Sequence, residues 1–242
     1  MTLADKLRMC GAVKKGIKFV GGDTIGFEGL TTDKIISLAS LVGGIDTQPR
    51  AGDIVMVING TVGGGAARNA ILPTGYTELF SNTAGNSNHY YAGAKMCYKV
   101  MGGTPDTSLI IPGGTGSTSS AGSISFLVFR NQNGTPIDVA SQYYLINNSA
   151  LANPPSITPI TNGAVIICAG VAGHGAGEQT FTSSDLTNFV SSGFNDSLDC
   201  TSGIGYKEWT GGAFDAAAFG FTTTDSTNYG SCAYTIALRP KT

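Results

Sequence analysis

The stretch Gly-Ser-Ile-Ser-Phe-Leu-Val-Phe-Arg-Asn-Gln-Asn-Gly-Thr-Pro-Ile-Asp-Val, residues 122–139, determines the fold class of this chain. Ile124, Phe126 and Val128 recur at the two-residue period of a β-strand and make one face of the strand apolar. The opposite face begins with serines and ends with Leu127 and Phe129. A strand with large apolar side chains on both faces is covered on both sides, as in an inner strand of a sandwich.

This predicted strand, Ser123–Arg130, is followed by turn chemistry. Asn131–Pro136 contains an Asn-Gly pair, which favours a turn. We expect the strand to be the central one of its sheet and Arg130 to form an ion pair with Asp138. No nucleophile, metal ligand or phosphate-binding loop lies at either end of the stretch, which favours a structural role over catalysis.

Short apolar or alternating runs separated by turn residues continue along the rest of the chain. Ile54–Ile58 and Ala164–Val171 are apolar throughout and predict further inner strands. The other predicted strands are Ile17–Val20 and Thr24–Phe27 (a hairpin around Gly21–Asp23), Lys34–Val42, Thr77–Phe80, Tyr90–Val100, Ser108–Ile111, Ala216–Thr222 and Cys232–Arg239. One short helix is predicted at Phe181–Val190, and connections are predicted at Ala140–Pro159 and Ser197–Lys207.

About ten short strands, no repeat of fixed period and no linker predict an all-β fold. We expect a single antiparallel β-sandwich, jelly-roll-like, over residues 17–242, with a barrel as the alternative. Residues 1–16 predict a short helix or N-terminal docking arm, because Leu3, Leu7 and Cys10 recur at helical spacing. The alternative for this segment is a frayed terminus.

The composition restricts the functional class. Charged residues make up 12% of the chain, about half the share of an average soluble domain, and Gly accounts for 35 of its 242 residues. The net charge is −2 and no basic block occurs, so nucleic acid is not an expected partner. The N-terminus lacks the apolar core of a signal peptide, and no apolar run is long enough to span a membrane, so membrane insertion is not expected. A low surface charge is typical of a surface covered by neighbouring subunits.

Metal, cofactor and catalytic sites are not predicted. Three cysteines lie within strand-like runs, where we expect them to be small buried side chains: Cys97, Cys168 and Cys232. The other two, Cys10 and Cys200, lie in terminal or polar surroundings. No disulfide framework or zinc site is expected, because ligand spacings are missing.

His174 is a candidate catalytic residue, because it lies in a Gly-rich stretch near Glu178 and a Gly-flanked histidine on a loop can act in a hydrolase. A turn residue is the favoured interpretation.

One aromatic cluster suits ligand binding. Tyr90 and Tyr91 follow two asparagines, and Trp209 is the single tryptophan. Aromatic faces beside amides suit sugar rings, so these three residues are the candidate glycan or interface residues. The favoured interpretation places them in the core or at a subunit interface.

Several motifs follow one another along the chain: Ala51-Gly52-Asp53 before an apolar strand, Leu72-Pro73-Thr74-Gly75-Tyr76, Ala94–Val100, the stretch at 125–138 and Asn162–Val165. Their order resembles a β-sandwich domain of tailed-bacteriophage virion proteins. The resemblance covers roughly Ile17 to Pro240 and implies a particle-exposed, non-enzymatic protein that forms a homotrimer or another homo-oligomer.

The expected function is therefore that of a virion structural protein, made without export and assembled with itself and other virion proteins. A tail fibre or other tail component that contacts the host surface is the first hypothesis. A capsid decoration protein and a lectin-like module that binds a host-surface glycan are the alternatives.

Overall fold

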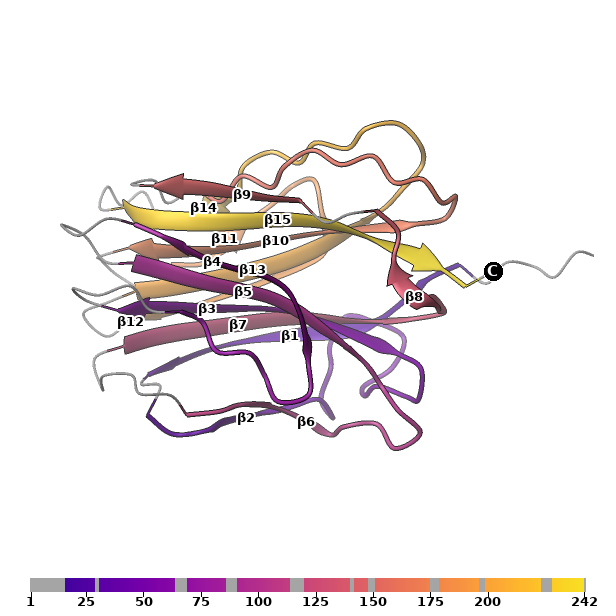
Figure 1. The fold of residues 1–242 in the computed structure, drawn as a ribbon, viewed down its shortest axis with the longest axis horizontal. Coiled ribbons are helices and arrows are strands. Elements are labelled where there is room, and N and C mark those ends of the chain that lie inside the picture. The colour runs from indigo at the N-terminus through magenta and orange to yellow at the C-terminus, as the bar shows by residue number, and fades with distance from the viewer. Residues whose placement is uncertain are drawn as a thin grey trace, which may run out of the picture.

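The computed structural model describes residues 16–28, 31–63, 69–85, 91–113, 120–139, 142–147, 151–174, 179–195, 199–222 and 228–241 (Figure 1). These residues contain fifteen β-strands and no helix, and the strands pair antiparallel throughout. The predicted all-β antiparallel fold is confirmed. A helix long and apolar enough to cross a membrane is absent from the described part of the chain.

Two large sheets pack face to face (Figure 1). In spatial order, the first contains β1 (Lys18–Glu28), β7 (Ser120–Arg130), β3 (Ile54–Gly63), β5 (Tyr91–Val100) and β4 (Thr77–Ala84). The second contains β12 (Thr187–Asn195), β13 (Asp199–Glu208), β10 (Val165–His174) and β15 (Asn228–Pro240), and β15 pairs on its far side with both β8 (Gln132–Ile137) and β9 (Gln142–Asn147). Two short ribbons are β2 (Lys34–Ser37) with β6 (Ser108–Ile111), and β11 (Phe181–Thr182) with β14 (Gly220–Phe221).

The β7 strand is covered on both faces, as its sequence predicts. Leu127 and Phe129 belong to the central apolar cluster between the sheets. Ile124 and Phe126 belong to a second cluster on the outer face, beneath the ribbon of β2 and β6, which Leu109 enters from β6. A third apolar cluster covers the outer face of the second sheet. The central strand of the first sheet is β3, however, and β7 lies beside it.

Several predicted elements differ from the observed ones. The predicted hairpin at Gly21–Asp23 is instead part of the single strand β1, which has a bulge between Phe19 and Gly21. The predicted helix Phe181–Val190 is wrong, because this segment forms β11 and the start of β12. Strands also occupy most of the predicted turn after Arg130 and parts of the two predicted connections, as β8, β9 and β13.

Arg130 does not pair with Asp138. The guanidinium donates from Nε and Nη2 to the two carboxylate oxygens of Asp53, each over 2.8 Å, and Nη2 also lies 3.3 Å from Asp46. Asp138 instead accepts from Arg239 Nε over 3.3 Å. The predicted pair is close in sequence, whereas the observed partner of Arg130 lies 77 residues away, where β3 begins beside the end of β7.

The two sheets repeat the same arrangement, although no repeat of fixed period is evident in the sequence. Every strand of the first sheet comes from residues 18–130 and every strand of the second from residues 132–240, so the jelly-roll connectivity is not confirmed. Each central strand follows a turn with a glycine at φ 82°, Gly52 before β3 and Gly163 before β10. In each sheet the central strand lies between a hairpin, β4–β5 or β12–β13, and the last long strand, β7 or β15.

The two sheets approach most closely at one margin, where β1 lies over β12. A side chain at Gly26 would collide with the backbone of Gly193. Ser202 contacts the hydroxyls of Ser123 and Ser125 on the opposite sheet over 2.7 and 2.8 Å. Small residues and hydroxyl pairs therefore join the sheets there, which explains the polar half of the β7 face.

Candidate functional site at the β9 edge

The opposite margin, where β4 faces β9, is built from aromatic residues. Tyr143 of β9 lies 5.6 Å from Phe80 of β4, measured between ring centroids, and Phe80 stacks on Tyr234 of β15 at 5.3 Å. The Tyr234 hydroxyl donates to Asn82 over 3.2 Å. Burial raises the pKa of Tyr234 well above its usual range, so this hydroxyl stays neutral.

The β9 strand forms part of an edge of the second sheet. Its sequence, Gln-Tyr-Tyr-Leu-Ile-Asn, is rich in strand-forming residues. It pairs with β15 from Gln142↔Thr235 to Asn147↔Gly230, and among the described residues no strand pairs with its other side. An unpaired edge presents a row of backbone donors and acceptors to a further strand.

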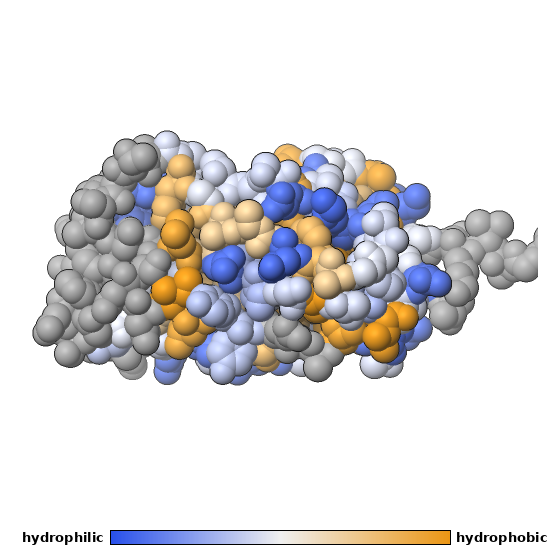
Figure 2. Space-filling model, turned by 90° about the horizontal axis from the view of Figure 1, so that it is seen from above, coloured by the Kyte–Doolittle hydropathy of each residue, from blue (hydrophilic) through white to orange (hydrophobic). Residues whose placement is uncertain are grey.

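Three consecutive side chains of β9 are large, mostly apolar and exposed. Tyr143 is 52% exposed, Tyr144 46% and Leu145 37%, and Leu151, just beyond the strand, is 49% exposed. The Ser231 hydroxyl donates a hydrogen bond to the Leu151 carbonyl over 2.9 Å. Because Ser231 also pairs with Ile146 of β9, this bond places Leu151 beside the strand. Figure 2, which views the molecule from above, shows hydrophobic residues gathered toward the left of the view and again toward the right, among polar ones.

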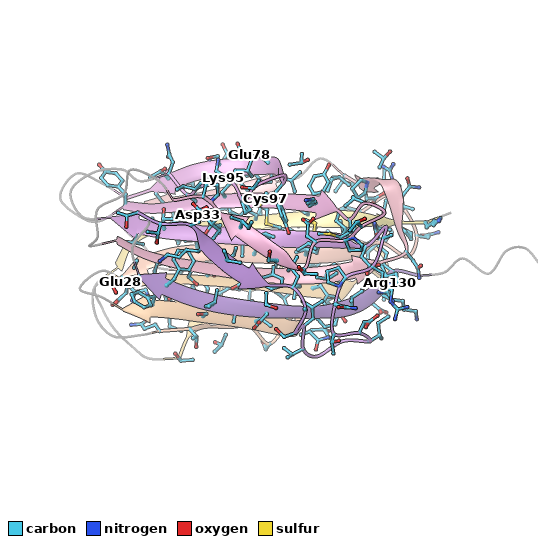
Figure 3. All side chains as sticks on the ribbon, turned by 90° about the horizontal axis from the view of Figure 1, so that it is seen from below. Glu28, Asp33, Glu78, Lys95, Cys97 and Arg130 are labelled. Atoms are coloured by element: carbon cyan, nitrogen blue, oxygen red, sulfur yellow. The ribbon has the colours of Figure 1, made fainter. Side chains whose placement is uncertain are left out.

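The edges formed by β1, β4 and β12 are charged or covered. The β1 edge carries Lys18, Asp23 and Glu28. The β4 edge carries Glu78, which pairs with Lys95 of β5 (Figure 3). The β12 edge packs against β1 and receives a hydrogen bond from the Phe181 N–H to the Ser191 hydroxyl over 2.8 Å. β9 combines exposure, apolar side chains and the lack of any charged residue.

His174 lies in a buried polar cluster at the end of β10, where a turn was expected. Its Nε2 lies 2.8 Å from the Thr201 hydroxyl, and its Nδ1 lies 3.4 Å from a carboxylate oxygen of Asp199. His174 and Asp199 are each 1% exposed, and Thr201 is fully buried. The order hydroxyl, imidazole, carboxylate is that of a hydrolase triad, so the positions of its protons matter.

The hydrogen bonds assign the protons of this cluster. The Thr201 hydroxyl donates its single hydrogen to the carbonyl of Gln179 over 2.8 Å, since a carbonyl can only accept. The Thr201 oxygen must therefore accept from His174, and Nε2 carries a hydrogen. An imidazole nitrogen that already donates cannot take a proton from the hydroxyl, so the arrangement joins the ends of β10 and β13 rather than activating a nucleophile.

Of the predicted aromatic binding residues, the two described ones, Tyr91 and Trp209, are not brought together. Tyr90 lies outside the described residues, and Tyr91 is half-buried at the start of β5, beside Gly63. Trp209 follows β13 at the opposite end of the sandwich and is half-buried against the third cluster, and its indole N–H donates to Gly212 over 2.8 Å. The docking-arm residues Leu3, Leu7 and Cys10 lie outside the described residues.

The four described cysteines are free and buried. This burial confirms the prediction for Cys97, Cys168 and Cys232, but Cys200 was expected in polar surroundings and is fully buried, because β13 places it in the central cluster. Burial raises the pKa of Cys168 to about 12 and keeps the thiol neutral. Within the described ranges, no group of three or more His, Cys, Asp or Glu residues is placed to hold a metal ion.

Sequence reasoning missed β9 as a site because the residues around Tyr143 and Tyr144 were interpreted as a connection. The signal was six consecutive residues without Gly, Pro or charge, three of them strand formers. No family model matches the chain. No curated protein matches it, and no solved structure does.

Proposed function

We propose that this chain is a non-enzymatic structural protein of a bacteriophage particle, a tail fibre or other tail component that assembles through its own sheet edge. The β9 strand carries this proposal, because a rigid sandwich that presents an uncharged aromatic edge is suited to contact with other protein chains. The composition supports the same role, with few charges and many glycines.

Two alternatives have less support. A hydrolase is disfavoured by the His174 cluster, whose hydrogen bonds leave no basic nitrogen facing the Thr201 hydroxyl. A glycan-binding module is disfavoured because Trp209 is half-buried against the third cluster, at the opposite end of the sandwich from Tyr91. A capsid decoration protein would use the same kind of surface, and the location on the particle separates it from a tail component.

Locating the protein on the particle tests the proposal. Particles are purified from the culture that produces the chain, labelled with antibodies raised against it and imaged by electron microscopy with gold. We expect gold along the tail. Gold on the head would replace the tail assignment with capsid decoration. Protein that stays in the particle-free fraction, with unlabelled particles, would overturn the structural role.

A further inference from the structure

We infer that β9 is a self-association strand, on which β9 of a second copy pairs antiparallel about a two-fold axis. This joins the second sheets of two copies into one continuous sheet. The inference names the partner of the edge on which the proposed function rests. It predicts a dimer as the basic unit, where the resemblance implies a homotrimer or another homo-oligomer.

The repeated architecture of the chain identifies β9 as the unusual edge. β9 and the Asp23–Glu28 part of β1 occupy corresponding positions in the two sheets. Each pairs with the outer side of the last long strand of its sheet, β9 with β15 and β1 with β7. The β1 part carries a carboxylate at each of its two ends, Asp23 and Glu28, and Figure 3 shows Glu28 at the end of the sheet opposite Arg130. Charged residues on an edge oppose pairing with another chain. β9 has no such residue.

A second copy fits this edge better than a charged partner does. The six β9 residues carry no charge with which an acidic or basic peptide could pair. Two-fold pairing brings the same uncharged segment against itself, so no like charges meet, and each strand supplies the backbone groups that the other lacks. Tyr143, Tyr144 and Leu145 of both copies then bury their exposed surface together.

The margin is also rigid enough to hold such a pair. Tyr143 rests on Phe80, which stacks on the buried Tyr234, so the edge is supported from inside the sandwich. Tyr144 faces the other way, on the outer face of the sheet, because it pairs with Ala233 of the third cluster. A substitution at Tyr144 therefore changes the exposed edge without removing a ring from the aromatic stack.

The solution mass of the full chain tests the inference by light scattering and sedimentation. We expect the wild type to form a dimer, with twice the 24.7 kDa of one chain. Tyr144→Lys places like charges near the axis and weakens dimerisation at least about tenfold. Leu145→Lys is the second variant, in case the first fails to fold as judged by circular dichroism.

The matched control is Ile35→Lys, which adds the same charge at a residue of β2 that is 72% exposed. This variant should remain dimeric. A monomeric wild type, or dimers that survive both lysine substitutions in β9, would overturn the inference. Either result leaves the particle-labelling outcome unaffected, so failure of the β9 contact is distinguishable from failure of the proposed function.

Discussion

Asp53 and Arg130 form the ion pair that fixes the start of β3 to the end of β7. The Asp53 side chain is 1% exposed and accepts from Arg130 Nε and Nη2 and from the Arg50 N–H, each over 2.8 Å. Asp53→Asn removes the buried carboxylate that pairs with the guanidinium and leaves it only the longer contact with Asp46, at 3.3 Å. Because Arg130 retains some solvent contact, we expect a loss of about 2 kcal/mol in the free energy of unfolding, below the value for a fully buried pair. Urea unfolding measures it.

Arg50→Ala is the matched control for Asp53→Asn. Arg50 also contacts a carboxylate, Asp46 at 2.8 Å, but its side chain is 67% exposed. Exposed pairs contribute less than about 1 kcal/mol, so the variant should unfold near the wild type. If both variants lost the same free energy of unfolding, burial of Asp53 would not determine how strongly the Asp53–Arg130 pair stabilises the fold.

Asp138 makes the stability of the protein sensitive to acid. Burial alone would raise the pKa of this carboxyl, but hydrogen bonds from the Thr161 hydroxyl, from the Ile160 and Thr161 N–H groups and from Arg239 lower it overall. A lowered pKa in the folded state contributes stability that is present above the unfolded pKa of about 3.9 and is lost as pH falls through the folded value.

The expected result is a free energy of unfolding that declines below about pH 4, and less steeply in Asp138→Asn. Urea unfolding at a series of pH values measures both slopes. Asp46, whose pKa is lowered first by the Thr47 N–H, contributes in the same direction and remains in the variant. Identical acid slopes in the two proteins would contradict a role for Asp138.

At the scale of elements, the close margin between β1 and β12 depends on glycine. A Cβ at Gly26 would meet the backbone of Gly193 and the Cβ of Phe194, and backbone cannot yield as a flexible side chain can. We expect Gly26→Ala to lower the free energy of unfolding by about 1–3 kcal/mol, as overpacking does. Thermal or urea unfolding measures the loss.

Gly134→Ala provides the comparison within a strand. Gly134 lies in β8 with open space around its Cα, so an added methyl should change the free energy of unfolding by less than about 0.5 kcal/mol. If Gly26→Ala were equally harmless, the two sheets would not be held at the spacing that the structure shows.

The apolar strands β3, β7, β10 and β15 could be predicted from sequence, because burial on both faces requires long apolar runs. β13 could not, since Gly203 and Gly205 read as loop residues. They are glycines because rings lie directly over them, Phe181 and Phe189 above Gly203 and Phe189 above Gly205. That requirement arises from tertiary packing, and no local pattern reports it.

The candidate site was harder to predict than the core. Tyr143 and Tyr144 are adjacent and point to opposite faces, so they give no alternation of polar and apolar residues. The β9 edge becomes visible only once β15 is known to pair on that side. His174 was similarly misleading, because its partner Thr201 lies 27 residues away, in a strand that reads as polar.

At the scale of the whole molecule, two sheets of similar construction cover each other. The central cluster contains Leu127 and Phe129 of the first sheet together with Ile167 and Ile236 of the second, and these faces have no other cover among the described residues. By position in their sheets, β1 corresponds to β9 and β12 corresponds to β4. The contact of β1 with β12 at one margin therefore corresponds to the contact of β9 with β4 at the other, as if an approximate two-fold rotation related the two sheets. Neither sheet buries its inner face without the other.

This mutual cover predicts a single cooperative unfolding transition for residues 17–242, which is also what a single domain requires. Trp209, the only tryptophan, reports through its fluorescence on the second sheet, whereas far-ultraviolet circular dichroism reports on both. We expect the two signals to change with the same midpoint and slope in urea. If the sheets were independent units, the circular dichroism would show a second step that the Trp209 fluorescence does not follow, because strands of the first sheet would melt while the surroundings of Trp209 remained intact.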